Sequence, residues 1–376
     1  MIRPSRLLLV LFALHTAVRL AAGDARITVQ NRFTAQGTLL VGARLTDASA
    51  SLGWKPELFG EFEPFADCRL SGDVSMDNRL ELVFEGGDPD QDIDLSLYRA
   101  WLAASWKQTE LKAGLQHIRM GVAQIYRPLQ WFDDLVPGSF LQESQGVRAL
   151  TLSHFFPNPE LRVWALPGTG KTKGRERIAT RKGVWELGGR AGLINAGGET
   201  GISFLHRILQ NDQDPDNQVR EFRFGLDQRL DGFMGCWLEA DFNYLSHEIG
   251  VYEGGGFVPE PRYYGSATIG GDYTFAIGNG LYILGEGNYE WGRAAQSRNE
   301  SCWSGAVLLN YPLGLLDGLQ WLGAYQQEDK RLSGMLSWRR TYDKLSWDLS
   351  LGFTQSDYEG SGKKTGLASL TINYDI

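Results

Sequence analysis

The sequence predicts an all-β protein, a transmembrane antiparallel β-barrel of about 18 strands, with about 16 as the alternative count. Three observations predict this fold. Segments of strand length alternate apolar and polar side chains, aromatic residues gather at segment ends, and the connections alternate between short and long. The composition agrees, since 46 of the 376 residues are Gly and the chain holds 12 Trp, 14 Tyr and 18 Phe. So many aromatic residues exclude a disordered chain, and together with Gly they favour strands over helices.

The alternation is clearest in residues 345–353. One face of this segment holds Leu345, Trp347, Leu349, Leu351 and Phe353, and the other holds Ser346, Asp348, Ser350 and Gly352. Because successive side chains of a strand point to opposite faces, the segment has one apolar and one polar face. A soluble sandwich also alternates. Charged residues within the polar faces and aromatic residues at strand ends favour a barrel with a lipid-facing outside and a watery lumen.

About 18 segments fit this pattern. Their approximate spans are 26–44, 58–71, 79–86, 93–107, 110–121, 147–156, 161–168, 184–194, 199–209, 219–230, 236–248, 263–277, 280–292, 301–312, 319–328, 331–342, 345–356 and 366–376. Even-numbered connections are mostly short and odd-numbered ones mostly longer, such as 45–57, 122–146, 169–183 and 249–262. Short turns on one side and long loops on the other are typical of outer-membrane barrels. The short connection at Asp329-Lys330 breaks this rule, so the strand count stays open.

The first 23 residues have the pattern of a secretory signal peptide. Arg3 and Arg6 precede an apolar stretch, and Ala21-Ala22-Gly23 fits a cleavage site after Gly23, with a cut after Ala25 as the alternative. We expect residues 24–376 to form a single barrel domain in the outer membrane of a Gram-negative-type cell. Outer-membrane lipid and lipopolysaccharide are then its surroundings.

The last strand resembles the terminal strand that the barrel assembly machinery reads. Tyr374 stands third from the end, but Ile376 takes the place of the usual Phe. The resemblance implies the assembly machinery as a partner. A homotrimer is a candidate assembly that the sequence does not fix, because trimer contacts would use the same apolar face that meets lipid.

Several classes of site are disfavoured. The net charge of −8 disfavours a nucleic-acid partner. Cys68, Cys236 and Cys302 stand far apart, which predicts neither a metal site nor a disulfide framework, and we expect no cofactor. Residues 165–172 fit a relaxed phosphate-loop expression. The basic stretch after them lacks the apolar stripe of the helix that such a loop requires.

The longest connection, 122–146, is the candidate constriction. Residues 111–121, Arg127-Pro128-Leu129, Phe132 and 146–148 resemble a pattern in porin-like outer-membrane channels, including alginate-export-like and substrate-specific porins. Leu115 stands where that pattern usually has Arg. The resemblance covers about residues 98–148 and implies that the long loop narrows the barrel. It also implies that Gln116 faces inward and that Arg119, Arg127, Asp133 and Asp134 lie near the constriction. The alternative is that Arg127 and Asp133 form an ion pair that pins the loop to the wall.

Strand alternation predicts further charged residues on the lumen side. These are Arg190, Arg207, Glu221, Arg223, Asp227, Arg229, Glu239, Asp241, Asp272, Glu286 and Glu290. The arginines cluster in predicted strands 8–10 and the acids in strands 11–13, which suggests a transverse field across the pore. The loops also differ in charge: residues 171–182 are basic, whereas Asp212, Asp214 and Asp216 form one acidic loop and Asp88, Asp90 and Asp92 another.

These features predict a channel for passive diffusion of ions or small polar solutes. One alternative is a structural barrel that holds a lipoprotein or cytochrome partner. Another is an outer-membrane hydrolase, which would need a nucleophile and a base brought together across strands. The adjacent Ser153 and His154 point to opposite faces of a strand, so they cannot form such a pair. We therefore expect a protein that is not an enzyme.

Overall fold

A computed structural model of the chain describes residues 26–42, 48–65, 67–85, 88–132, 146–211, 218–253, 256–292, 301–328, 330–356 and 363–375. The predicted signal peptide lies outside the described residues. So do Asp133 and Asp134 of the candidate constriction, and the predicted acidic loop at Asp212, Asp214 and Asp216.

The protein is all-β, and 18 strands form one sheet. They are β1 (Arg26–Gly42), β2 (Ala48–Phe65), β3 (Cys68–Glu85), β4 (Asp88–Trp106), β5 (Thr109–Gln116), β6 (Val147–Phe155), β7 (Glu160–Pro167), β8 (Trp185–Asn195), β9 (Gly198–Ile208), β10 (Arg220–Asp231), β11 (Gly235–Leu245), β14 (Tyr263–Phe275), β15 (Leu281–Trp291), β16 (Ser301–Pro312), β17 (Asp317–Gln326), β18 (Arg331–Thr341), β19 (Leu345–Ser356) and β20 (Lys363–Asp375). The larger of the two predicted strand counts is confirmed. A separate hairpin, β12 (Ile249–Glu253) with β13 (Gly256–Glu260), occupies part of the predicted loop 249–262.

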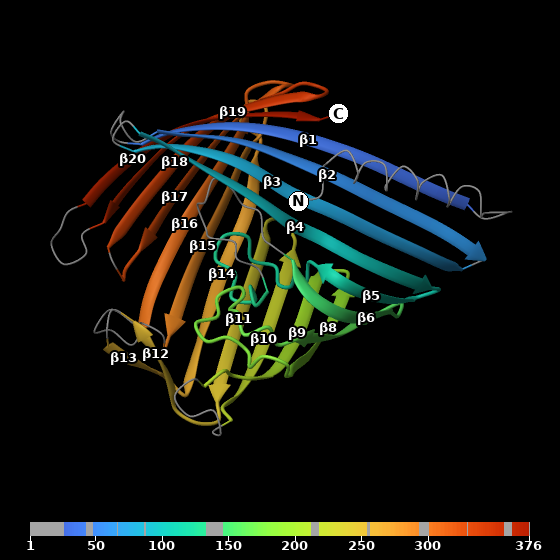
Figure 1. Cartoon of the computed structure of the whole chain (residues 1–376). Helices are drawn as coiled ribbons and strands as arrows, with labels where there is room; N and C mark the ends of the chain where they lie inside the picture. Colours follow the sequence, from blue (N-terminus) through green and yellow to red (C-terminus); the bar gives the residue numbers. More distant parts are fainter. Residues whose placement is uncertain are drawn as a thin grey trace.

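The sheet closes on itself. Strands that are consecutive around the ring pair antiparallel, and β1 pairs with both β2 and β20, for example at Leu39↔Leu370. Figure 1 shows the strands side by side in chain order around the enclosed space. Among the described strands, closure leaves the 18-stranded sheet without an unpaired edge, which a membrane requires because lipid offers no hydrogen bonds to an exposed backbone.

The first four strands correct the predicted boundaries. They run for 17, 18, 18 and 19 residues, whereas a tilted strand needs only about 9–11 to cross the hydrocarbon region. The predicted loop 45–57 therefore belongs mostly to β2, and residues 72–78 belong to β3. Asp88, Asp90 and Asp92, predicted in an acidic loop, lie within β4 and pair with β3. Ala48, Ala50, Leu52 and Trp54 alternate with Ser49, Ser51, Gly53 and Lys55, so part of β2 does carry the strand pattern, and Pro56 interrupts it.

Burial is reversed relative to a soluble protein. In β10 the side chains of Glu221, Arg223 and Asp227 are at most 4% exposed, whereas Phe224 and Leu226 are 49% and 43% exposed. The same reversal occurs in β11, where Glu239 is buried and Phe242 is exposed. Polar residues therefore face the lumen and apolar residues face outward, as a lipid-embedded barrel requires. None of the described residues forms a helix long and apolar enough to cross a membrane.

Closure between the first and last strands predicts a specific cross-link. With the three native cysteines replaced by Ser, the pair Leu39→Cys and Leu370→Cys should form a disulfide on oxidation, because directly opposed residues have the required spacing. The matched control is Leu39→Cys with Ile372→Cys, one step along the same face of β20. The cross-linked chain should migrate faster than the reduced chain on a denaturing gel. Equal yields in the two pairs, or no cross-link in either, would contradict the closed register.

Candidate functional site

The connection between β5 and β6 enters the barrel. Its described part, residues 117–132, is called here the inner loop. Predicted strand 110–121 ends already at Gln116, so the inner loop starts earlier than the sequence suggested. Figure 1 shows this teal segment within the ring of strands. Its backbone contacts with inward-facing residues of β11 and β15 establish that it lies in the lumen.

Glu239 of β11 holds one part of the inner loop. Its Oε2 accepts hydrogen bonds from the backbone amides of Val122 and Ala123, both at 2.8 Å, and its Oε1 accepts one from Leu129 at 2.7 Å. The close approach requires Gly121, which has a φ of +83°, because a Cβ there would lie 2.1 Å from Oε2 of Glu239. The carboxylate and three loop amides thus satisfy one another's hydrogen-bonding groups.

Glu286 of β15 holds the tip of the loop in the same way. It accepts hydrogen bonds from the amides of Gln124, Ile125 and Tyr126 at 2.7, 2.9 and 2.7 Å, and from Nε1 of Trp237 at 2.9 Å. The hydroxyl of Tyr126 donates to the carbonyl of Gly305 at 3.2 Å. Burial, together with the nearby Glu286 carboxylate, raises the pKa of Tyr126 to about 12, so the phenol keeps its proton and remains a donor.

An apolar cluster closes the space between the inner loop and the wall formed by β6, β7 and β9. The cluster comprises Ile118, Met120, Leu129, Trp131 and Phe132 of the loop, and Val147, Ala149, Trp164, Leu166 and Leu205 of the wall. Phe132 meets Trp164 edge to face, with ring centroids 5.8 Å apart. Residues on the lumen side of these strands are therefore packed as in a protein core, and this part of the barrel is filled.

The connection 168–184 also turns inward and carries the predicted basic residues with it. Lys173 binds Glu176 at 2.8 Å and Glu186 at 2.6 Å. Arg175 pairs with Glu290, and Arg177 pairs with Glu260 at 2.9 Å. Three cations of this loop thus compensate acids of the barrel, of the β12–β13 hairpin or of the loop itself.

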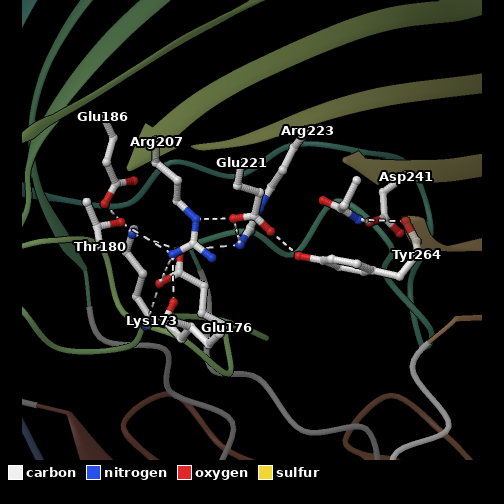
Figure 2. Close-up of polar contacts among 11 residues, drawn as sticks. Lys173, Glu176, Thr180, Glu186, Arg207, Glu221, Arg223, Asp241 and Tyr264 are labelled. Atoms are coloured by element: carbon white, nitrogen blue, oxygen red, sulfur yellow. Dashed lines mark hydrogen bonds and ion pairs between the residues drawn. The ribbon is translucent and has the colours of Figure 1, made fainter. Parts of the chain in front are cut away.

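Figure 2 shows the buried network that results. Arg207 of β9 contacts Glu176 at 2.9 Å, pairs with Glu221 of β10, and donates to the carbonyl of Ile178 at 3.0 Å. Arg223 contacts Glu221 at 3.1 Å, and the hydroxyl of Tyr264 donates to the same carboxylate. Because buried charges are costly unless paired, each member depends on its neighbours.

The other predicted lumen residues that the structure describes are also engaged. Arg190 binds Asp227 at 2.7 Å, and Arg229 lies 2.8 Å from Asp231 and 3.5 Å from Asp272. Asp241 accepts hydrogen bonds from the amide and the hydroxyl of Ser266. The arginines predicted in strands 8–10 and the acids predicted in strands 11–13 therefore do not form two opposed surfaces of uncompensated charge. Charges are compensated within neighbouring strands or by the loops.

The residues that the resemblance to porin-like channels places at the constriction differ in their exposure. Gln116 faces inward but is covered; its amide donates to the carbonyl of Ala149 at 2.8 Å, and its oxygen accepts from Thr151 at 3.0 Å. Arg127 is buried in the inner loop, and Arg119 is exposed. A pair between Arg127 and Asp133 stays a prediction, since Asp133 lies outside the described residues. Sequence reasoning missed Glu176 and Glu186; a lone acid within the basic run 171–182 was the available signal for Glu176.

No protein-family model and no curated protein matches the sequence. Solved structures do match. OccK5 (OpdH) of Pseudomonas aeruginosa is 11% identical, with 93% of this chain and 98% of that chain covered and a TM-score of 0.57. OpdK of Pseudomonas aeruginosa, solved with vanillate, is 11% identical over 94% and 98% of the two chains, with a TM-score of 0.57. OmpF of Salmonella typhi, in complex with daunomycin, is 13% identical over 93% and 97%, with a TM-score of 0.50.

At this identity the likeness shows the fold alone. The chain has a porin-like barrel, which confirms the resemblance of residues 98–148 at the level of fold class.

The two inward carboxylates predict how the inner loop responds to mutation. In the double variant Glu239→Gln and Glu286→Gln, each side chain loses acceptor capacity and gains an NH₂ group that faces amide donors. Each loss should cost about 1–3 kcal/mol. We expect larger and noisier single-channel conductance in planar bilayers. Glu199→Gln, which alters a lumen carboxylate paired with Arg190, is the control. Unchanged conductance and noise in the double variant would refute this role of the carboxylates.

The buried network predicts a large stability difference between two arginines. Arg207→Met leaves Glu176 and Glu221 without their central cation, so the free energy of unfolding should fall by about 3–5 kcal/mol. Arg69→Met removes a half-exposed ion pair with Glu61 and should cost at most about 1 kcal/mol. Urea unfolding from lipid vesicles, followed by tryptophan fluorescence, measures both. Similar losses in the two variants would mean that the network is not a structural element.

Proposed function

We propose that the protein is an outer-membrane channel for passive diffusion of ions or small polar solutes, narrowed by the inner loop. The observation that carries this proposal is a closed barrel whose lumen is narrowed but not filled. The inner loop covers one side, and a cavity of about 220 Å³ remains between Ile125 at its tip and the wall of β17–β20. An outward apolar surface and an inward polar surface support a membrane location.

The similar solved structures support this proposal through their fold. OpdK is described as an outer membrane protein. The resemblance of residues 98–148 supports a porin-like channel of the alginate-export-like or the substrate-specific type. Outer-membrane lipid, lipopolysaccharide and the assembly machinery are the partners that such a channel requires. A homotrimer stays a prediction.

The enzyme alternative receives less support. Thr109 Oγ1 and His154 Nδ1 lie 2.7 Å apart, a hydroxyl–imidazole pair of the kind a hydrolase uses. However, the neighbouring pair Glu110 and Ser153 faces the lumen. Because successive side chains of a strand point to opposite faces, Thr109 and His154 face outward. The pair also lies at the short-turn end of the barrel, away from the inner loop. One observation favours the alternative of a barrel that holds a partner. Two loops, the inner loop and the connection 168–184, partly fill the lumen.

Conductance of the refolded chain in a planar bilayer tests the proposal. A channel should give discrete, steady current steps that scale with salt concentration, and a salt gradient should give a defined reversal potential. Refolding is verified separately by protease resistance and by the heat-dependent shift of mobility on gels. A folded barrel that carries no current would contradict the channel and support the partner-holding alternative.

A further inference from the structure

Two parts of the barrel's inward surface differ in their chemistry. Residues 320–326, 333–337, 350–354 and 365–373 of β17–β20 contain no charged residue at any position. The side chains of these segments that face the lumen are together called the uncharged wall. By contrast, the nine residues 221–229 of β10 include four charged side chains: Glu221, Arg223, Asp227 and Arg229. Glu239 of β11, which pairs with Asp227 in the sheet register, extends the same charged surface.

The orientation of the uncharged wall follows from burial and register. Leu336, Leu351 and Phe353 are 41–54% exposed on the outside, whereas Ser337 and Ser350 are 7% and 3% exposed. The hydroxyls of these two serines are 2.7 Å apart across the β18–β19 pair. Small hydroxyl-bearing residues therefore face the lumen along these strands.

The cavity beside the inner loop opens onto this wall. Ile125 forms its loop side, and the wall contributes the aliphatic side chains Leu322, Met335 and Leu367 together with the hydroxyls of Ser333, Thr354 and Thr365. On β9–β11 and β15, Glu239 and Glu286 accept hydrogen bonds from loop amides, and Arg207 and Arg223 lie within ion pairs. These charged residues are thus engaged by the loops, and the cavity beside Ile125 borders the uncharged wall.

We propose that solutes cross the barrel along the uncharged wall and that this passage favours small uncharged solutes bearing both hydroxyl groups and an apolar face. The inference rests on the proposed channel function. Ser and Thr hydroxyls donate and accept hydrogen bonds, so they replace the water that a solute hydroxyl sheds. Aliphatic side chains pack against the solute's C–H surface. An ion loses hydration at the same place and meets no opposite charge in the described lining, which makes its passage costly.

Rates of liposome swelling test the solute class. Proteoliposomes are placed in isotonic glucose or in isotonic sodium gluconate, two solutes of similar size that differ by a carboxylate. Glucose should enter several times faster than gluconate. Equal rates, or faster entry of gluconate, would overturn the inference while leaving a channel in place. No swelling with either solute would contradict the channel itself, so the two failures are distinguishable.

Cysteine modification tests the route. In a background with the native cysteines replaced by Ser, Ser333→Cys places a thiol on the uncharged wall. Ser203→Cys is the matched control, because Ser203 also faces the lumen but is 1% exposed beneath the inner loop. N-ethylmaleimide, an uncharged reagent, should remove most of the current through Ser333→Cys and leave Ser203→Cys unchanged. Block in Ser203→Cys, or no block in Ser333→Cys, would overturn the proposed route.

Discussion

The position of the inner loop depends on two carboxylates that face the lumen. Glu239 and Glu286 together accept hydrogen bonds from six backbone amides between Val122 and Leu129. These amides have no place in the barrel ladder, and a loop inside a barrel must satisfy them in some way. Two fixed anions on β11 and β15 do so, and they set how far the loop reaches across the lumen. The apolar cluster around Trp131 and Phe132 then fills the side that the loop covers.

Charge compensation follows from the same constraint. A barrel of this kind places polar side chains inside, and loops that enter it remove water from them. Each charge so covered needs a protein partner, because an unpaired buried charge is strongly destabilising. Arg207, Glu221 and Glu176 meet this need in one network, and Arg190 and Asp227 in another. The charged residues of β9–β11 and β15 therefore act as a scaffold for the loops, and the uncharged wall of β17–β20 borders the cavity beside Ile125.

Most of the fold could be predicted from the sequence, because a strand's two-residue period is a local property. Alternation identified the strand segments and showed that residues such as Arg207 and Glu239 face the lumen. The first four strands were harder. Residues 48–55 keep the alternation, but Pro56, which cannot donate to a sheet ladder, interrupts the pattern within β2. The partners of the lumen charges could not be predicted either. They depend on register between strands and on the path of loops distant in sequence, as in the contact of Val122 with Glu239.

Hydrogen exchange of the backbone amides in residues 122–126 measures the anchoring of the inner loop most directly. The folded barrel in detergent or lipid would be exposed to deuterated water, and peptides covering this segment would be analysed by mass spectrometry. We predict strong protection, comparable to that of the barrel strands, because these amides donate to buried carboxylates. Exchange at the rate of an unstructured peptide, in a barrel whose strands remain protected, would contradict this prediction.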